Sequence, residues 1–263
     1  MPKQFTVKTQ DGIEWYCEQQ GSGPNLILIP SGEGDCFSFS KIASILSVSF
    51  TVTTFDMPGF SRTVAPESMW ENFKSLRLLS KQIVGLMDEL SIESAHFYGC
   101  SSGGAAVLGL VADHPTRVTS GIVHEVPVGE YKDVKALLKL DDDGIRDACR
   151  GLFRTVMCED QAAWEALGPD YHARVDKNYV TWVKRYVGGL ESPSWSEKEL
   201  QRKPVRWTIG ALNPAGMFFD NVPIAVKAGI PIDLLSCKHF PQVTIPENLA
   251  EHIKESALRM AGA

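Results

Sequence analysis

The chain has 263 residues, of which 44% are hydrophobic and 22% charged, a composition typical of a folded globular protein and not of a disordered or collagen-like chain. Its 26 basic and 32 acidic residues give a net charge of −6, which leaves no broad cationic surface for nucleic acid. The longest apolar stretch, residues 105–112, is far shorter than the roughly 20 residues that cross a bilayer. We therefore expect one α/β unit with an insertion, and neither nucleic acid nor membrane as a partner.

The N-terminal residues are polar where a secretory signal needs an apolar segment, so we expect a cytoplasmic protein. The six cysteines are scattered without C-x-x-C spacing, which is typical of free thiols in a reducing compartment. We expect no metal site and no cofactor.

Short apolar runs rich in β-branched and aromatic residues alternate with longer amphipathic stretches, which predicts a mostly parallel sheet with helices on both faces. The predicted elements are, in chain order, a hairpin of strands 5–9 and 13–19, strands 26–30 and 51–55, a helix 70–90, a strand 95–99, a helix 103–113, a strand 118–126, strands 205–210 and 232–236, and a helix 246–260. Residues 129–203 have a helical, charged texture. We predict an α/β core formed by residues 1–128 and 204–263, and a helical cap formed by 129–203.

The sequence Gly-Cys-Ser-Ser-Gly at 99–103 fits G-x-S-x-G, and it stands between a predicted strand and a predicted helix, as a nucleophile elbow requires. This pattern selects Ser101 as the nucleophile. Two alternatives stay open: a frame shifted by one residue, with Ser102 as the nucleophile, and serines that only cap the helix.

A serine hydroxyl needs a base to take its proton, and histidine suits that role because it titrates near neutrality. His239 follows the last predicted strand, where the chain order serine, acid, histidine places the base. Packing or surface roles explain His96, His114 and His252 better. His172 lies in the insert, where contact with a ligand stays open.

The acid stands at an unusual place. Where many folds of this type have an aspartate after the strand that follows the insert, this chain has Asn213, and an amide cannot supply the negative charge that supports an imidazolium. Glu125 ends the strand after the elbow helix and reaches the same edge of the sheet, so we select it. Asp220 is the alternative, although it is also explained as a helix start.

An acyl-transfer site needs N–H donors for the oxyanion. One should be the N–H of Ser102, and the other should come from the loop Pro-Ser-Gly-Glu-Gly at 30–34, where we select Gly32 and keep Glu33 as the alternative. Asp56 is interpreted as part of a structural turn.

With these residues the chain resembles the α/β-hydrolase superfamily and, within it, the fungal zearalenone hydrolases, which open a resorcylic macrolactone. The stretches that carry the resemblance are GCSSG at 99–103, HEVP at 124–127, HARVDKNYVTW at 172–182, FFDN at 218–221 and HFP at 239–241.

The resemblance implies a triad of Ser101, Glu125 and His239, which agrees with the selection above. It also implies that Trp182 hydrogen-bonds the lactone and that Val156 lines the pocket. Val187 stands where the family leads us to expect proline. Trp164 and Trp195 are interpreted as packing residues.

The resulting hypothesis is a cofactor-free carboxylic-ester hydrolase that acts on a hydrophobic lactone such as zearalenone. A general esterase or thioesterase for another hydrophobic acyl substrate and a ligand receptor with vestigial hydrolysis remain as alternatives. A homodimer also stays open.

Overall fold

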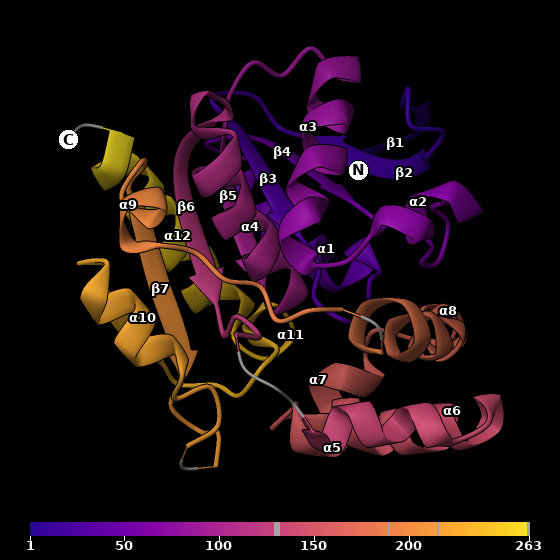
Figure 1. Cartoon of the computed structure of the whole chain (residues 1–263). Coiled ribbons are helices and arrows are strands. Elements are labelled where there is room, and N and C mark those ends of the chain that lie inside the picture. Colours follow the sequence, from indigo (N-terminus) through magenta and orange to yellow (C-terminus); the bar gives the residue numbers. More distant parts are fainter. Residues whose placement is uncertain (129–131, 189, 215, 262–263) are drawn as a thin grey trace.

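The computed structural model describes residues 1–128, 132–188, 190–214 and 216–261, and its centre is one eight-stranded sheet (Figure 1). The strands are, in chain order, β1 (Lys3–Lys8), β2 (Glu14–Gln20), β3 (Asn25–Ile29), β4 (Thr51–Phe55), β5 (Ala95–Cys100), β6 (Val118–His124), β7 (Val205–Gly210) and β8 (Ile232–Leu235). Their order across the sheet is β1-β2-β4-β3-β5-β6-β7-β8. Strand β2 pairs antiparallel with β1 and β4, and the other neighbours pair in parallel. The predicted mostly parallel sheet with an opening hairpin is confirmed.

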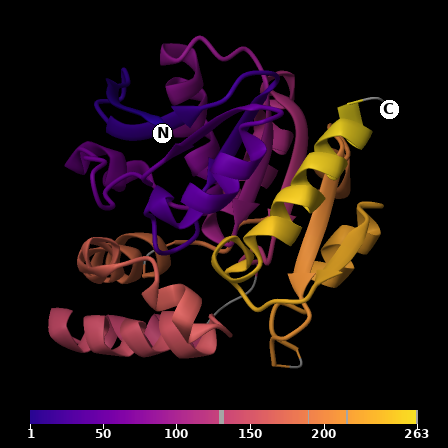
Figure 2. The same cartoon turned by 180° about the vertical axis from the view of Figure 1, so that it is seen from behind.

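Helices cover both faces of this sheet. The α-helices are α1 (Ser40–Leu46), α2 (Glu67–Asn72), α3 (Leu79–Glu89), α4 (Ser102–Asp113), α5 (Lys132–Lys135), α6 (Asp142–Gly151), α7 (Gln161–Glu165), α8 (Pro169–Thr181), α9 (Glu197–Leu200), α10 (Asn221–Lys227), α11 (Pro241–Thr244) and α12 (Pro246–Ala261). Helices α3 and α4 pack on one face, and α1 and α12 pack on the other (Figures 1 and 2). This arrangement explains why β5 is buried along its whole length and why its residues are mostly hydrophobic, with His96 as the exception.

Parallel pairing brings the carboxyl ends of the central strands to one edge. Gly99 on β5 is level with Ile29 on β3 and with Val123 on β6. The loops that follow these strands therefore meet at the same edge, which is where open α/β folds bind ligands.

The predicted single helix over 70–90 is wrong. Helix α2 ends at Phe73, which has the non-helical backbone angles φ −82° and ψ 86°. Helical structure resumes only after Ser75, whose side chain accepts a hydrogen bond from the Arg77 N–H. At the break, the Glu191 N–H donates to the carbonyl of Lys74 over 2.8 Å. A distant segment thus takes a backbone acceptor that a continuous helix would use internally.

Helices α5 to α8 lie together beyond the carboxyl edge of the strands, as Figure 1 shows. Two short π-helical segments continue two of them, Leu152–Val156 after α6 and Trp182–Val187 after α8. The predicted start of the cap, at residues 129–131, lies outside the described residues. At the other end of the predicted cap the chain contacts the core again. There Glu199 on α9 forms an ion pair with Arg77 at 2.6 Å.

All six cysteines are buried and free. In the described part of the chain, no helix is both long enough and apolar enough to span a membrane.

Candidate active site

Ser101 occupies the sharp turn between β5 and α4. Its backbone has φ 52° and ψ −117°, a conformation that residues with a side chain rarely adopt. The Ser101 N–H donates to the carbonyl of His124 on the neighbouring strand over 2.8 Å. A Cβ atom at Gly99 would overlap the carbonyl of Gly103, and one at Gly103 would overlap the carbonyl of Ile29. The two glycines of the motif are therefore required by close backbone packing around the turn.

Glu125 directly follows β6 and also has a positive φ, 48°. Its carboxylate accepts three hydrogen bonds. Oε2 accepts from His239 Nδ1 at 2.6 Å, and Oε1 accepts from the Gly210 N–H at 2.7 Å and from Asn213 Nδ2. Asn213, which stands where many folds of this type have the acid, thus donates a hydrogen bond to the carboxylate of Glu125. Asp220, the alternative acid, is exposed at the start of α10.

His239 is held by contacts of its backbone and of its ring. The backbone N–H of His239 donates to the carbonyl of Met157 over 3.0 Å, and the backbone carbonyl of His239 accepts from the Cys100 thiol at 3.1 Å. The ring of Phe218 stacks on the imidazole with centroids 4.8 Å apart and planes within 3°. Because a carboxylate only accepts hydrogen bonds, the bond to Glu125 places the proton of the neutral imidazole on Nδ1. Nε2 is then free to accept a proton.

Ser101 and His239 line one pocket of about 650 Å³. This volume falls within the roughly 300–1,000 Å³ of small-molecule sites. The walls are mainly apolar and come both from segments around the sheet and from the segment predicted as the cap, including Leu76, Pro127, Leu152, Met157, Leu190 and Met217. Trp182, Val156 and Val187 also line it, and all three belong to the π-helical segments. Such segments are frequent at functional sites.

The N–H groups selected for the oxyanion lie in different settings. Ser102 begins α4 and lines the pocket. Gly32 lies under the indole of Trp182, since a Cβ atom on Gly32 would be 2.5 Å from Trp182 Nε1. Among the described residues, no protein acceptor receives either N–H. The alternative donor is the N–H of Glu33. This residue is fully buried, and burial raises the pKa of its carboxyl group.

The electrostatics favour an ionised Glu125. Burial works toward a higher pKa, but the charge interaction with His124, the hydrogen bond from His239 and the N–H of Gly210 outweigh it, so the pKa of Glu125 lies below its usual value. His124 itself is fully buried, with Nδ1 2.9 Å from Thr208 Oγ1 and Nε2 3.2 Å from the carbonyl of Lys238.

His124 gives a prediction for stability. Burial lowers the pKa of His124 to about 4, whereas an unfolded histidine titrates near 6.5. Between these values the unfolded chain binds more protons than the folded one, so the free energy of unfolding must fall as the pH falls. We expect His124 to contribute a loss of about 3 kcal/mol from pH 7 to pH 4.

Urea unfolding of the wild type and of His124→Gln across this range measures the contribution. The wild type should lose about 3 kcal/mol more than the variant, whose amide does not titrate. Parallel curves would refute the assignment.

Other residues singled out in the sequence lie elsewhere. His172 contacts the rings of Trp164 and Tyr171 and does not line the pocket. Trp164 is buried against Phe240, in agreement with a packing role. Asp56 is buried and forms an ion pair with Arg62 at 2.7 Å, which supports the structural turn.

Three contributors were missed by the sequence interpretation of the site: His124, the contact of Asn213 with Glu125, and the stacking of Phe218. The conspicuous stretches HEVP and FFDN contain two of them, but contacts across the sheet decide their roles. Among the described residues, His124, Glu125 and His239 are also the set whose ligand atoms lie close enough together for a metal ion. Hydrogen bonds already engage the nearest of those atoms.

Comparison with known proteins agrees with the fold. The sequence profile of the alpha/beta hydrolase fold matches residues 24–198. A zearalenone hydrolase from Cladophialophora bantiana is 41% identical over 254 residues, covering 95% of each chain. A zearalenone hydrolase from Bionectria ochroleuca is 36% identical over 261 residues, covering 97% of this chain and 98% of the relative.

Solved structures with lower sequence identity show the same fold. The enol-lactonase from Burkholderia xenovorans has a TM-score of 0.71 at 18% identity, covering 97% of this chain and all of the enzyme. Naproxen esterase from Bacillus subtilis has a TM-score of 0.72 at 16% identity, covering 97% of this chain and 91% of the esterase. With a profile match over most of its length and relatives of this identity, the chain belongs to the α/β-hydrolase fold family.

Proposed function

We propose that this hydrolase opens a large, mostly apolar lactone of the zearalenone type, with Ser101 as nucleophile, His239 as base and Glu125 as the acid that supports it. The observation that carries the proposal is the pocket lined by both Ser101 and His239, whose imidazole is bound to a buried carboxylate at 2.6 Å. The names of the two zearalenone hydrolases that match over nearly the whole chain supply the substrate class.

In the first half of the reaction, Ser101 Oγ forms a bond to the lactone carbonyl carbon while His239 Nε2 takes the hydroxyl proton. Collapse of the tetrahedral intermediate breaks the ring C–O bond, and His239 returns the proton to the leaving alkoxide. In the second half, His239 Nε2 takes a proton from a water whose oxygen bonds to the acyl carbon. Collapse of this second intermediate breaks the bond to Ser101 Oγ, His239 returns the proton to that oxygen, and the hydroxy acid is released. Glu125 stays ionised and stabilises the imidazolium throughout.

The oxyanion of each intermediate is stabilised by the N–H groups of Gly32 and Ser102. A preorganised donor of this kind contributes about 3 to 4 kcal/mol of transition-state stabilisation. Trp182, whose indole lies against Gly32, binds the lactone beside these donors. Val156 and Val187 shape the apolar part of the pocket.

Parallel assays on zearalenone and p-nitrophenyl butyrate test the substrate class. We expect multiple turnovers on zearalenone, with a product heavier than the substrate by one water. Ester cleavage without lactone opening would instead favour a general esterase, and stoichiometric binding without turnover would favour a receptor.

The contact between Gly32 and Trp182 leads to a prediction. Gly32→Ala introduces a methyl group 2.5 Å from the indole nitrogen, so the indole or the loop must shift. We expect kcat/KM on zearalenone to fall by about 100-fold, the cost of a displacement near 1 Å at a reacting centre.

Gly151→Ala is the matched control, because nothing lies within 4 Å of a Cβ atom at that position of α6. This variant should keep wild-type activity and gain slightly in stability, since alanine favours a helix. An unchanged kcat/KM in Gly32→Ala would contradict the tight contact.

A further inference from the structure

We propose that Asn178, on the cap helix α8, is a positioning residue that fixes the backbone of residues 31–34, here called the oxyanion loop. Because Asn178 belongs to the cap, the alignment of the Gly32 N–H then depends on how the cap packs against the core. The inference rests on the proposed function and adds a residue to it.

Asn178 uses both donors of its side-chain amide, and its amide oxygen as an acceptor, between two core loops. Nδ2 donates to the carbonyl of Glu33 at 2.7 Å and to Ser61 Oγ at 2.8 Å, while Oδ1 accepts from the Ser61 N–H at 2.8 Å. Because a backbone N–H can donate only to the oxygen, this contact fixes the orientation of the amide. The side chain is 2% exposed, so loss of one bond leaves a buried polar group without a partner.

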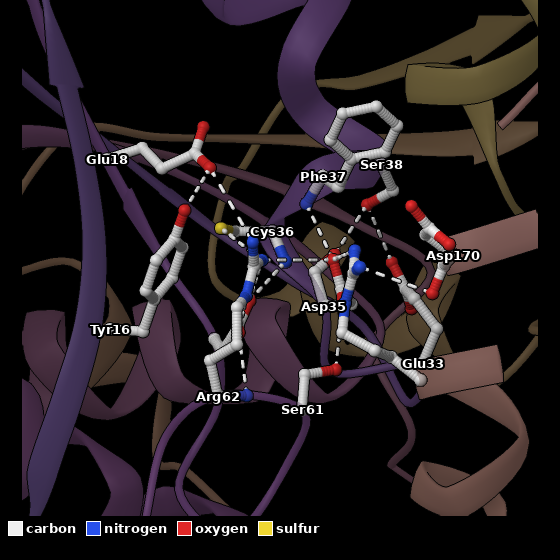
Figure 3. Close-up of polar contacts among 12 residues, drawn as sticks. Tyr16, Glu18, Glu33, Asp35, Cys36, Phe37, Ser38, Ser61, Arg62 and Asp170 are labelled. Carbon is white, nitrogen blue, oxygen red and sulfur yellow. Dashed lines mark hydrogen bonds and ion pairs between the residues drawn. The ribbon is translucent and has the colours of Figure 1, made fainter. Parts of the chain in front are cut away.

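The oxyanion loop is a closed turn whose geometry depends on few contacts. The Gly34 N–H donates to the carbonyl of Ser31, which belongs to the same peptide group as the Gly32 N–H. The Glu33 carboxyl accepts from the hydroxyl of Ser38, as Figure 3 shows. It also accepts from the hydroxyl of Ser31. Asn178 is the cap residue that binds the main chain at the centre of this turn.

The same cap helix contacts the loop a second time. Trp182 follows Asn178 by four residues, so the two side chains point to the same side of the helix. The Trp182 indole covers Gly32, and Asn178 holds the carbonyl of Glu33. One helix of the cap therefore controls both the position of a proposed oxyanion donor and the side chain beside it.

Arg174 makes a further contact between the cap and the core, and this contact does not involve the backbone of the oxyanion loop. Arg174, one turn before Asn178, binds the fully buried Asp35, with Nε 2.6 Å from Oδ2. Asp35 also accepts from the hydroxyl of Ser61, as Figure 3 shows, and from Arg62. Arg174 thus anchors the cap to the core through charge without touching the Glu33 carbonyl, which makes it a matched control.

The experiment compares Asn178→Ala and Asn178→Asp with Arg174→Gln. We expect both Asn178 variants to lower kcat on zearalenone by about 100-fold, the cost of a misplaced donor at the reacting centre. The Kd for zearalenone, measured in a Ser101→Ala background, should change by less than about threefold, because the pocket walls stay in place. Arg174→Gln should lower the melting temperature but leave kcat within about threefold, because Asp35 keeps its other donors.

Asn178→Asp keeps an acceptor for the Ser61 N–H and removes the donor toward Glu33, so it remains informative if Asn178→Ala does not fold. A kcat within threefold of wild type in a folded Asn178 variant would overturn the proposal. An equal loss of kcat in Arg174→Gln would also overturn it, because cap anchoring alone would then explain the effect.

The same comparison on p-nitrophenyl butyrate separates this inference from the choice of substrate. The oxyanion loop serves any ester, so the loss of kcat in the Asn178 variants should persist on that substrate. If the wild type cleaves the ester but not zearalenone, the substrate class fails while the role of Asn178 is still tested.

Discussion

Ser101→Ala is expected to lower kcat on zearalenone by about 10⁴- to 10⁶-fold, leaving only the rate that binding and the oxyanion donors support without a nucleophile. The protein should fold, because the Ser101 contacts that hold the turn are made by its backbone, through the N–H to His124 and the carbonyl to Ala105. Substrate affinity should change little, since the hydroxyl is small compared with the pocket. Mass spectrometry of the product over time measures the effect.

Ser102→Ala is the matched control, because it removes the neighbouring hydroxyl and keeps the backbone N–H. It should cost no more than about tenfold in kcat. If Ser102→Ala abolished turnover and Ser101→Ala did not, the shifted frame of the motif would be correct.

Glu125→Gln is expected to lower kcat by about 10³- to 10⁴-fold, as loss of the acid of a triad does. The carboxylate accepts from His239, Gly210 and Asn213 at once, and a glutamine has only one oxygen and brings an NH₂ group into a site lined by donors. The imidazole then loses both its orientation and the negative charge that supports its protonated form. Steady-state kinetics on zearalenone measures the loss.

Asp220→Asn should keep wild-type kcat, because Asp220 is exposed. A sharper test moves the acid. In a Glu125→Ala background, Asn213→Asp should restore at least about tenfold in kcat, because Asn213 already contacts the carboxylate that His239 uses. No recovery, together with full activity in Glu125→Gln, would remove Glu125 from the mechanism.

The strands of the fold could be predicted from the sequence because each is locally recognisable. Strand β5, buried along its whole length, is mostly hydrophobic apart from His96, and the glycines of the elbow mark its end. The break near Phe73 could not be predicted, because the Lys74 carbonyl there accepts from the N–H of Glu191, far away in the chain. Helical periodicity continues across that break and says nothing about the distant donor.

In the candidate site, too, features encoded locally could be predicted, whereas contacts between distant segments could not. Glu125 could be selected because strand order places its carboxylate at the correct edge, and Asn213 excluded the usual position. The second role of Asn213, as a donor to Glu125, depends on a contact between the segments that follow β6 and β7. The three hydrogen bonds of Asn178 likewise join segments more than 100 residues apart, which no local pattern encodes.

The most direct test of the account is the mass of the covalent intermediate. When a lactone acylates a serine, no atoms leave, so the acyl-enzyme gains the mass of one whole substrate molecule. We expect rapid acid quenching of the wild type with zearalenone to trap this adduct on the peptide that contains Ser101, and Ser101→Ala to lack it. Turnover with the adduct on another residue, or undiminished turnover in Ser101→Ala, would contradict the mechanism.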